Sequence, residues 1–237
     1  MCEPEVTPGP GAHDLLLSSG FLAFARHVGA LAAIEDAGVP IDAVVGTSSG
    51  ALIGALWAAG MPAAEIAAAL AEKPPYAFFS MQPRLWEGAL SLAPLLRWLT
   101  DRLPATFADL PRPFAAGVIG PGRVPRLFPE GNLPRAVVAS CAIPGVFLPI
   151  DIEGVSYRDG GVADRLMFEP WVAWRGRRPV IAHVVDRSAG HDPNVDLAGV
   201  TVLRSPKSGA SFFSLGNVEE GVAVSRRAAA GVLGAEV

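Results

Sequence analysis

Short apolar runs alternate with longer stretches of helical periodicity along residues 14–59. Residues 15–17 are all leucine, which is the pattern of a buried strand, and apolar residues recur on one helical face over 21–37. Residues 43–45 form a second apolar run, and an Ala- and Leu-rich helical pattern follows it. This strand–helix–strand–helix order predicts an α/β fold, in which helices cover both faces of a mostly parallel central sheet in three layers.

The later part of the chain continues this alternation with shorter elements. We predict helices over 63–71, 92–103, 132–140 and 215–233, strands over 114–119, 124–128, 180–186 and 200–203, a hairpin of 148–152 with 155–158, and a polar loop over 187–197. No repeat or linker interrupts the pattern. We therefore expect a flexible leader over 1–13 and one domain over 14–237.

An aromatic stretch over residues 76–99 has two interpretations. It contains Tyr76, Phe78, Phe79 and Trp86 and leads into a helical pattern. One interpretation is a core helix with its connecting loop. The other is an apolar lid, or a lipid-contact surface over an active site.

The composition narrows the function classes. The chain has 237 residues, a net charge of −4 and no basic run, so a nucleic-acid partner is not expected. Residues 43–64 are uncharged and long enough to span a bilayer, but their four glycines and one proline favour a buried strand, turn and helix. Cys2 and Cys141 form neither a disulfide framework nor a metal-ligand cluster. We expect a reducing, cytoplasmic setting without a cofactor or metal.

The second strand runs directly into Gly46-Thr47-Ser48-Ser49-Gly50, and a helix begins at once. Gly-x-Ser-x-Gly between a strand and a helix is the pattern of a nucleophile elbow, with Ser48 at the apex of a strained turn. Any Cβ at Gly46 or Gly50 would collide with neighbouring backbone. The helix N-terminus behind the serine directs N–H groups at developing negative charge.

A serine nucleophile needs a proton acceptor, and Asp159 is the candidate. It ends a predicted strand and precedes Gly160 and Gly161, which let the backbone pack closely around its carboxylate. The order Ser48, Asp159, then His183 or His191 also fits an α/β-hydrolase triad.

The α/β-hydrolase fold, however, has several strands before its elbow, whereas in this sequence the elbow follows the second predicted strand. We therefore favour a Ser–Asp dyad without histidine. His27 lies inside the first predicted helix as a packed or surface residue, and His13 lies in the leader.

Four segments resemble, in order, motifs of the patatin-like phospholipase family. They are Leu17-Ser18-Ser19-Gly20 with the helix after it, the elbow at 46–51, the block at 139–149 and Asp159-Gly160-Gly161. The resemblance spans residues 15–170 and implies a parallel α/β sheet with helices on both sides. It also implies that Ser48 is the nucleophile and Asp159 its base.

The oxyanion loop departs from the family pattern, which has a glycine run followed by an arginine. The aligned positions here are Ser19, Gly20 and Phe21, with Ala23 in place of the arginine. Backbone N–H groups bind an oxyanion, so side-chain changes need not abolish the site. Ser19 and Phe21 nevertheless restrict φ, and we expect strain if the turn requires a positive φ there.

The resemblance implies a serine acyl hydrolase that cleaves lipid carboxylic esters through an acyl-enzyme. The implied partners are a lipid ester substrate and a lipid interface, which a cytoplasmic protein would contact peripherally. Two alternatives stay open. A catalytically impaired relative would bind lipid or a partner, and an acyltransferase would use a related elbow, although Thr47 and Ala51 replace the His and Glu of malonyl-type transferases.

Overall fold

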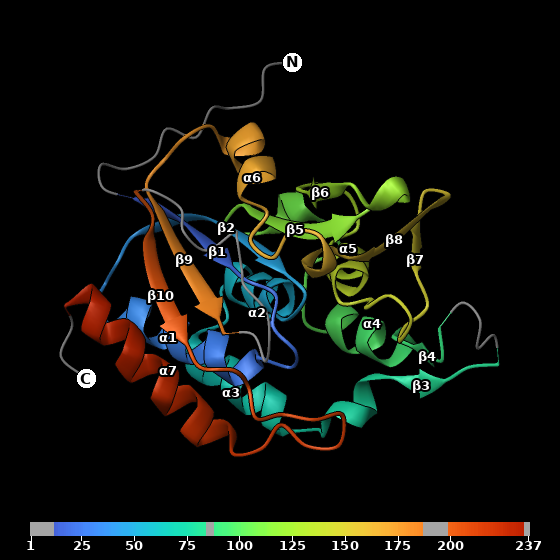
Figure 1. Cartoon of the computed structure of the whole chain (residues 1–237), viewed down its shortest axis with the longest axis horizontal. Coiled ribbons are helices and arrows are strands. Elements are labelled where there is room, and N and C mark those ends of the chain that lie inside the picture. Colours follow the sequence, from blue (N-terminus) through green and yellow to red (C-terminus); the bar gives the residue numbers. More distant parts are fainter. Residues whose placement is uncertain (1–11, 84–87, 187–198, 235–237) are drawn as a thin grey trace.

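The computed structural model describes residues 12–83, 88–186 and 199–234 (Figure 1). Its main sheet has eight strands in the order β10-β9-β1-β2-β5-β8-β7, with β6 also paired to β5. The parallel strands are β1 (His13–Leu17), β2 (Ile41–Thr47), β5 (Phe114–Ile119), β9 (Val180–Val185) and β10 (Thr201–Ser205).

Antiparallel strands complete one side of the sheet. They are β6 (Pro125–Phe128), β7 (Ile150–Ile152) and β8 (Val155–Asp159). A separate two-stranded sheet pairs β3 (Ser80–Met81) with β4 (Leu90–Ser91). The predicted α/β class, the mostly parallel sheet and the elbow after the second strand are confirmed.

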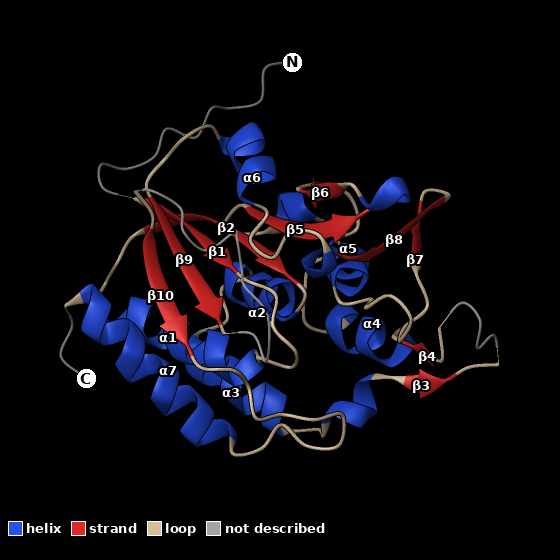
Figure 2. Ribbon diagram, in the orientation of Figure 1, coloured by secondary structure: helices blue, strands red, loops and turns tan. Residues whose placement is uncertain are grey.

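Helices lie on both faces of the sheet (Figure 2). They are α1 (Phe24–Asp36), α2 (Ser49–Ala58), α3 (Ala63–Ala71), α4 (Ala93–Thr100), α5 (Leu133–Ser140), α6 (Phe168–Arg175) and α7 (Val218–Leu233). Short 3-10 helices are η1 (Pro75–Phe78), η2 (Phe107–Asp109), η3 (Pro121–Arg123) and η4 (Gly160–Val162).

Alternation along β1 explains the two-sided core. Leu15 and Leu17 belong to the larger apolar cluster, which includes residues of α1 and α2, whereas Leu16 packs in the smaller cluster with Trp171 of α6. Successive side chains of a strand point to opposite faces, so one leucine run supplies both clusters. The sheet is therefore buried on both sides.

Three expectations about element boundaries change. His13 begins β1 and pairs with Ile41, so it does not belong to a leader. The first helix begins at Phe24 rather than at residue 21, because residues 20–22 form a turn. Helix α6 was not predicted. Residues 1–11 of the expected leader over 1–13 and the loop over 187–197, with His191, lie outside the described residues.

The uncharged stretch over 43–64 forms β2, the elbow, α2 and the start of α3. Within the described residues, every helix is too short or too polar to cross a bilayer.

Candidate active site

The elbow forms as its sequence requires. Ser48 lies between β2 and α2 with φ 56° and ψ −119°, a left-handed conformation that a residue with a Cβ rarely adopts. A Cβ at Gly46 would collide with the carbonyl group of Gly50, and a Cβ at Gly50 with the carbonyl group of Leu17. The two glycines thus allow the close backbone approach that holds Ser48 at the apex.

Ser140 fixes the backbone of the elbow from α5. The N–H of Ser48 donates to Ser140 Oγ at 2.8 Å, and the Ser140 hydroxyl donates to the carbonyl oxygen of Gly117 at 2.6 Å. Ser140 is fully buried, so water cannot replace either bond. Sequence analysis placed Ser140 in a motif block without giving it a role. Its contacts join segments that are far apart in the chain, and no local pattern reveals them.

Replacing Ser140 with alanine is expected to lower both stability and turnover. The change removes the acceptor of the Ser48 N–H and the hydroxyl that donates to the Gly117 carbonyl, at a cost of about 1–3 kcal/mol in the free energy of unfolding. Denaturant unfolding and ester hydrolysis measure the two effects. Ser156→Ala on the exposed side of β8 is the matched control. Unchanged unfolding and turnover in Ser140→Ala would show that this serine does not hold the elbow.

Asp159 reaches Ser48 from the end of β8. Pairing of β8 with β5 sets Asp159 opposite Val118, and the Asp159 carboxylate accepts the N–H of Gly161 at 2.8 Å. The side chain is buried, and burial raises its pKa from 3.8 to about 6. Hydrogen bonds from the Ser48 hydroxyl and the Gly161 N–H oppose this shift. The structure therefore brings Ser48 and Asp159 together, with a carboxylate that readily accepts a proton near neutral pH.

Gly160 and Gly161 fit tightly behind the carboxylate. A Cβ at Gly160 would collide with Met167, and a Cβ at Gly161 with the side chain of Ser19. The second glycine therefore lets the Asp159 turn lie directly against the loop that follows β1.

That loop is where the oxyanion hole was predicted. The N–H of Ser19 donates to the carbonyl oxygen of Arg165 at 3.0 Å, so it is not free to bind substrate. The N–H groups of Gly20 and Phe21 have no acceptor among the described residues, and both residues line the same cleft as Ser48. The positive φ, 47°, falls on Leu22. Ser19 and Phe21 do not have a positive φ, so the condition for strain at these two residues is not met.

His27 and His183 form a buried pair beside the elbow. Their Nδ1 atoms lie 2.8 Å apart, both residues are fully buried, and burial lowers the pKa of each. His27 Nε2 lies 3.3 Å from the hydroxyl of Ser49, not of Ser48. The pair contacts the residue after the predicted nucleophile, so the expectation of a packed His27 is confirmed.

The far end of this network sets the direction of its protons. The Ser225 hydroxyl must donate to the carbonyl oxygen of Arg26 at 2.6 Å, so Ser205 must donate to Ser225 and His183 Nε2 must donate to Ser205. His183 Nδ1 is then an acceptor, and His27 donates to it. Each neutral imidazole therefore donates its single N–H within the core: His27 to His183, and His183 to Ser205.

Two cavities meet at Ser48. A polar cleft of about 450 Å³ contains Ser48, Asp159, Gly20, Phe21 and Lys207. A narrow apolar pocket also reaches Ser48, and its lining includes Phe24, Leu52, Phe78, Phe79, Leu92, Leu95, Trp98 and Phe212. The described part of the stretch over 76–99 thus supplies core residues that also form a pocket wall, while Tyr76 and Met81 are exposed; residues 84–87, with Trp86, lie outside the described residues. This arrangement suits an ester whose acyl chain is apolar.

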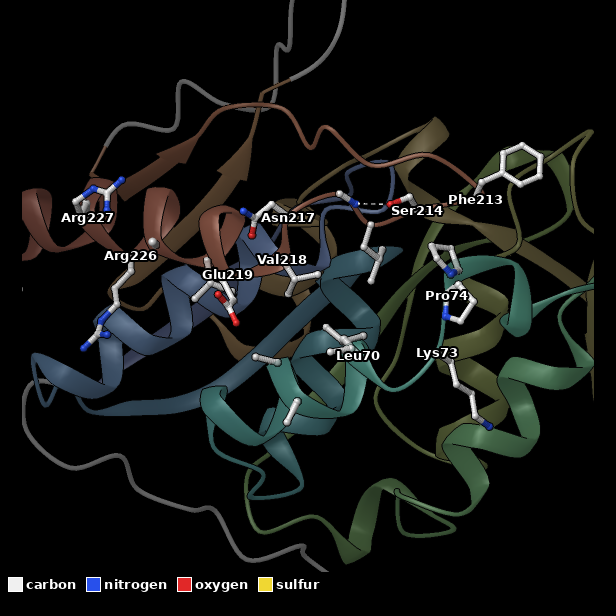
Figure 3. A pocket seen from close by; sticks show the side chains of 18 residues that line it. Leu70, Lys73, Pro74, Phe213, Ser214, Asn217, Val218, Glu219, Arg226 and Arg227 are labelled. Carbon is white, nitrogen blue, oxygen red and sulfur yellow. Dashed lines mark hydrogen bonds between the residues drawn. The ribbon is translucent and has the colours of Figure 1, made fainter.

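A larger groove of about 1050 Å³ lies between α3 and α7 (Figure 3). Arg226 and Arg227 lie at one end of it, and Lys73 and Phe213 at the other (Figure 3). It includes neither Ser48 nor Asp159 but shares Leu70 and Pro75 with the apolar pocket. Chemistry rather than size therefore locates the candidate site.

Other reactive groups do not compete with Ser48. Burial raises the pKa of the Cys141 thiol, which keeps it protonated and a poor nucleophile. Across the described ranges, no group of three or more His, Cys, Asp or Glu side chains is arranged to hold a metal ion.

Comparison with known proteins identifies the family of this chain. The family model of patatin-like phospholipases matches residues 15–170. An uncharacterized NTE family protein of Mycobacterium tuberculosis is 31% identical over 168 residues, which are 66% of this chain and 44% of that protein. Neuropathy target esterase sws of Drosophila persimilis is 56% identical over 43 residues, 18% of this chain and 3% of that protein. The chain thus spans less than half the length of these curated relatives.

Two solved structures share the fold at low sequence identity. VipD from Legionella pneumophila has a TM-score of 0.61 at 13% identity, and the match covers 95% of this chain and 67% of VipD. ExoU of Pseudomonas aeruginosa, solved in complex with SpcU, has a TM-score of 0.55 at 16% identity, over 95% of this chain and 52% of the matched chain.

Proposed function

Because this chain belongs to the patatin-like phospholipase family, we propose that it is a serine acyl hydrolase that cleaves lipid carboxylic esters through an acyl-enzyme. Ser48 is the nucleophile and Asp159 is the group that accepts its proton. The observation that carries the proposal is the contact of a strained elbow serine with a buried carboxylate whose pKa is raised to about 6.

The reaction follows from this pairing. Ser48 Oγ attacks the ester carbonyl carbon while Asp159 takes the hydroxyl proton. The N–H groups of Gly20 and Phe21 stabilise the oxyanion, and the C–O bond to the leaving alcohol breaks as Asp159 returns the proton to that oxygen. Water then attacks the carbonyl carbon of the acyl-enzyme as Asp159 takes its proton, and the bond to Ser48 Oγ breaks as Asp159 passes that proton to the serine oxygen, which releases the fatty acid.

A substrate panel tests the proposal. The purified protein and its Ser48→Ala variant are incubated with a short-chain nitrophenyl ester, phospholipid vesicles and emulsified triacylglycerol, and the released product is measured. Hydrolysis of at least one ester class by the native protein alone supports the assignment. A folded native protein that cleaves none of the three contradicts it and favours the impaired, lipid-binding alternative.

We further propose that the protein meets its substrate at a lipid surface. Among the described residues, Tyr76, Met81, Phe213 and Phe21 are large apolar side chains that are 54%, 76%, 80% and 49% exposed. Phe21 lines both cavities at Ser48, and Phe213 follows Phe212 of the apolar pocket. Exposed apolar side chains, one of them lining an apolar pocket, are typical of a surface that inserts into lipid.

The double variant Met81→Ser/Phe213→Ser is expected to bind phospholipid vesicles at least about tenfold more weakly, since each side chain contributes about 1.5–3 kcal/mol when buried. Turnover of a water-soluble ester is expected to stay unchanged, because neither residue contacts Ser48 or Asp159. Vesicle sedimentation and a nitrophenyl ester assay measure the two effects. Val124→Ser, at a site 62% exposed near β6, is the control. Equal vesicle binding by all three proteins would refute the surface.

A further inference from the structure

We propose that Arg165 is the positioning residue of the oxyanion loop, because it hydrogen-bonds directly to Ser19 at the start of that loop. The arginine of the family pattern is replaced here by Ala23, which is buried and precedes α1. The inference rests on the proposed function, because it explains how a loop of altered sequence is held for catalysis.

The Arg165 side chain forms hydrogen bonds with both the backbone and the side chain of Ser19. Its Nη2 donates to the carbonyl oxygen of Ser19 at 2.5 Å, and its Nε donates to Ser19 Oγ at 3.3 Å. In return, the N–H of Ser19 donates to the Arg165 carbonyl oxygen at 3.0 Å. The backbone N–H, the carbonyl oxygen and the hydroxyl oxygen of Ser19 are thus each hydrogen-bonded to Arg165.

The same guanidinium ties the loop to the end of β9. Arg165 Nη2 also donates to the carbonyl oxygen of Val185 at 2.6 Å, and the N–H of Val185 donates to Ser18 Oγ at 3.1 Å. Ser18 and Ser19 are therefore fixed to two neighbouring segments. The next two residues, Gly20 and Phe21, have N–H groups without a backbone acceptor among the described residues.

An arginine is required for this arrangement. Its planar guanidinium offers several donors in a fixed geometry and can bridge two carbonyl groups, whereas a lysine ammonium acts as a point donor. Arg165 is 5% exposed, so water cannot easily take over its bonds. It also lines the polar cleft beside Ser48 and Asp159, which places a positive charge at the wall where negative charge would develop.

The test compares three variants, Arg165→Lys, Arg165→Met and Arg165→Ala, with the control Arg178→Ala. The native Arg178 forms an ion pair with Asp42 at the opposite end of β1 and β2, so its loss shows the effect of lowered stability alone. We expect Arg165→Met to lower kcat by about 10²–10³-fold, the effect of losing one oxyanion donor, with KM unchanged. Arg165→Lys should recover little of this loss. Added guanidinium ion should raise kcat of Arg165→Ala but not of Arg178→Ala.

Hydrogen exchange supplies a readout that does not need activity. Amides of residues 20–23 should exchange faster in each Arg165 variant than in the native protein and in Arg178→Ala. Native kcat in Arg165→Met, or native exchange at this loop, would overturn the inference. Failure of the proposed function gives a different result, because the native protein would then cleave no ester. Hydrogen exchange would still test whether Arg165 orders residues 20–23.

Discussion

Ser48→Ala is expected to remove ester hydrolysis almost completely, with a fall in kcat of at least about 10⁴-fold. Without the hydroxyl no acyl-enzyme can form, and only binding and oxyanion stabilisation remain. The fold should be unaffected, because the N–H of residue 48 keeps its bond to Ser140 and alanine meets the same φ of 56° as serine. Initial rates on the best ester of the panel, with denaturant unfolding beside them, measure both expectations.

If Ser48→Ala unfolds like the native protein and retains a tenth or more of native turnover, Ser48 is not the nucleophile. Loss of activity together with loss of folding would point to the elbow conformation instead. The two results separate a chemical role from a structural one.

Asp159→Asn is expected to lower kcat by about 10²–10⁴-fold, the usual contribution of a general base. The amide has nearly the shape of the carboxylate but cannot take the Ser48 proton. In the native protein, kcat/KM should rise with pH and level off above about 6, because Asp159 must be ionised to act and its pKa is raised to about 6. The variant should lose this rise.

The same substitution has an opposite effect on stability. Burial raises the pKa of Asp159 from 3.8 to about 6, so ionisation of the folded protein is disfavoured relative to the unfolded chain. Native stability from this group is therefore greatest below the unfolded pKa and declines as the pH rises through about 6. Asp159→Asn should unfold at higher denaturant concentration than the native protein at neutral pH.

His183→Ala is the control for this prediction. His183 contacts the core network rather than Ser48, so the variant should lose stability but keep the pH dependence of kcat/KM. If it reduced kcat as much as Asp159→Asn and shifted the same pH dependence, a histidine would share the role of base and the dyad would be wrong.

The elbow and the parallel sheet could be predicted because short-range rules determine them. Gly46 is needed for a backbone contact within the elbow turn, and the leucine run at 15–17 needs only period-two alternation to fill both faces. The strand before Asp159 and the glycines after it are also local. These features can be predicted because the residue types in each segment determine its local backbone conformation.

Residues that support the site could not be found in this way. Ser140 meets Ser48 across 92 positions and Arg165 meets Ser19 across 146, so their roles depend on strand order rather than local pattern. Helix α6 was missed because it has only eight residues, with Pro170 inside it and a single buried side chain, Trp171. Its packing against the sheet, not its periodicity, makes it a helix.

The central claim, that Ser48 is a nucleophile poised by a buried carboxylate, is tested most directly by reacting the folded protein with a fluorophosphonate ester and mapping the adduct by peptide mass spectrometry. The account predicts one adduct, on the peptide that carries Ser48, formed slowly in Asp159→Asn and absent from Ser48→Ala. An adduct on another residue, or an unmodified Ser48 in protein that hydrolyses esters, would contradict it.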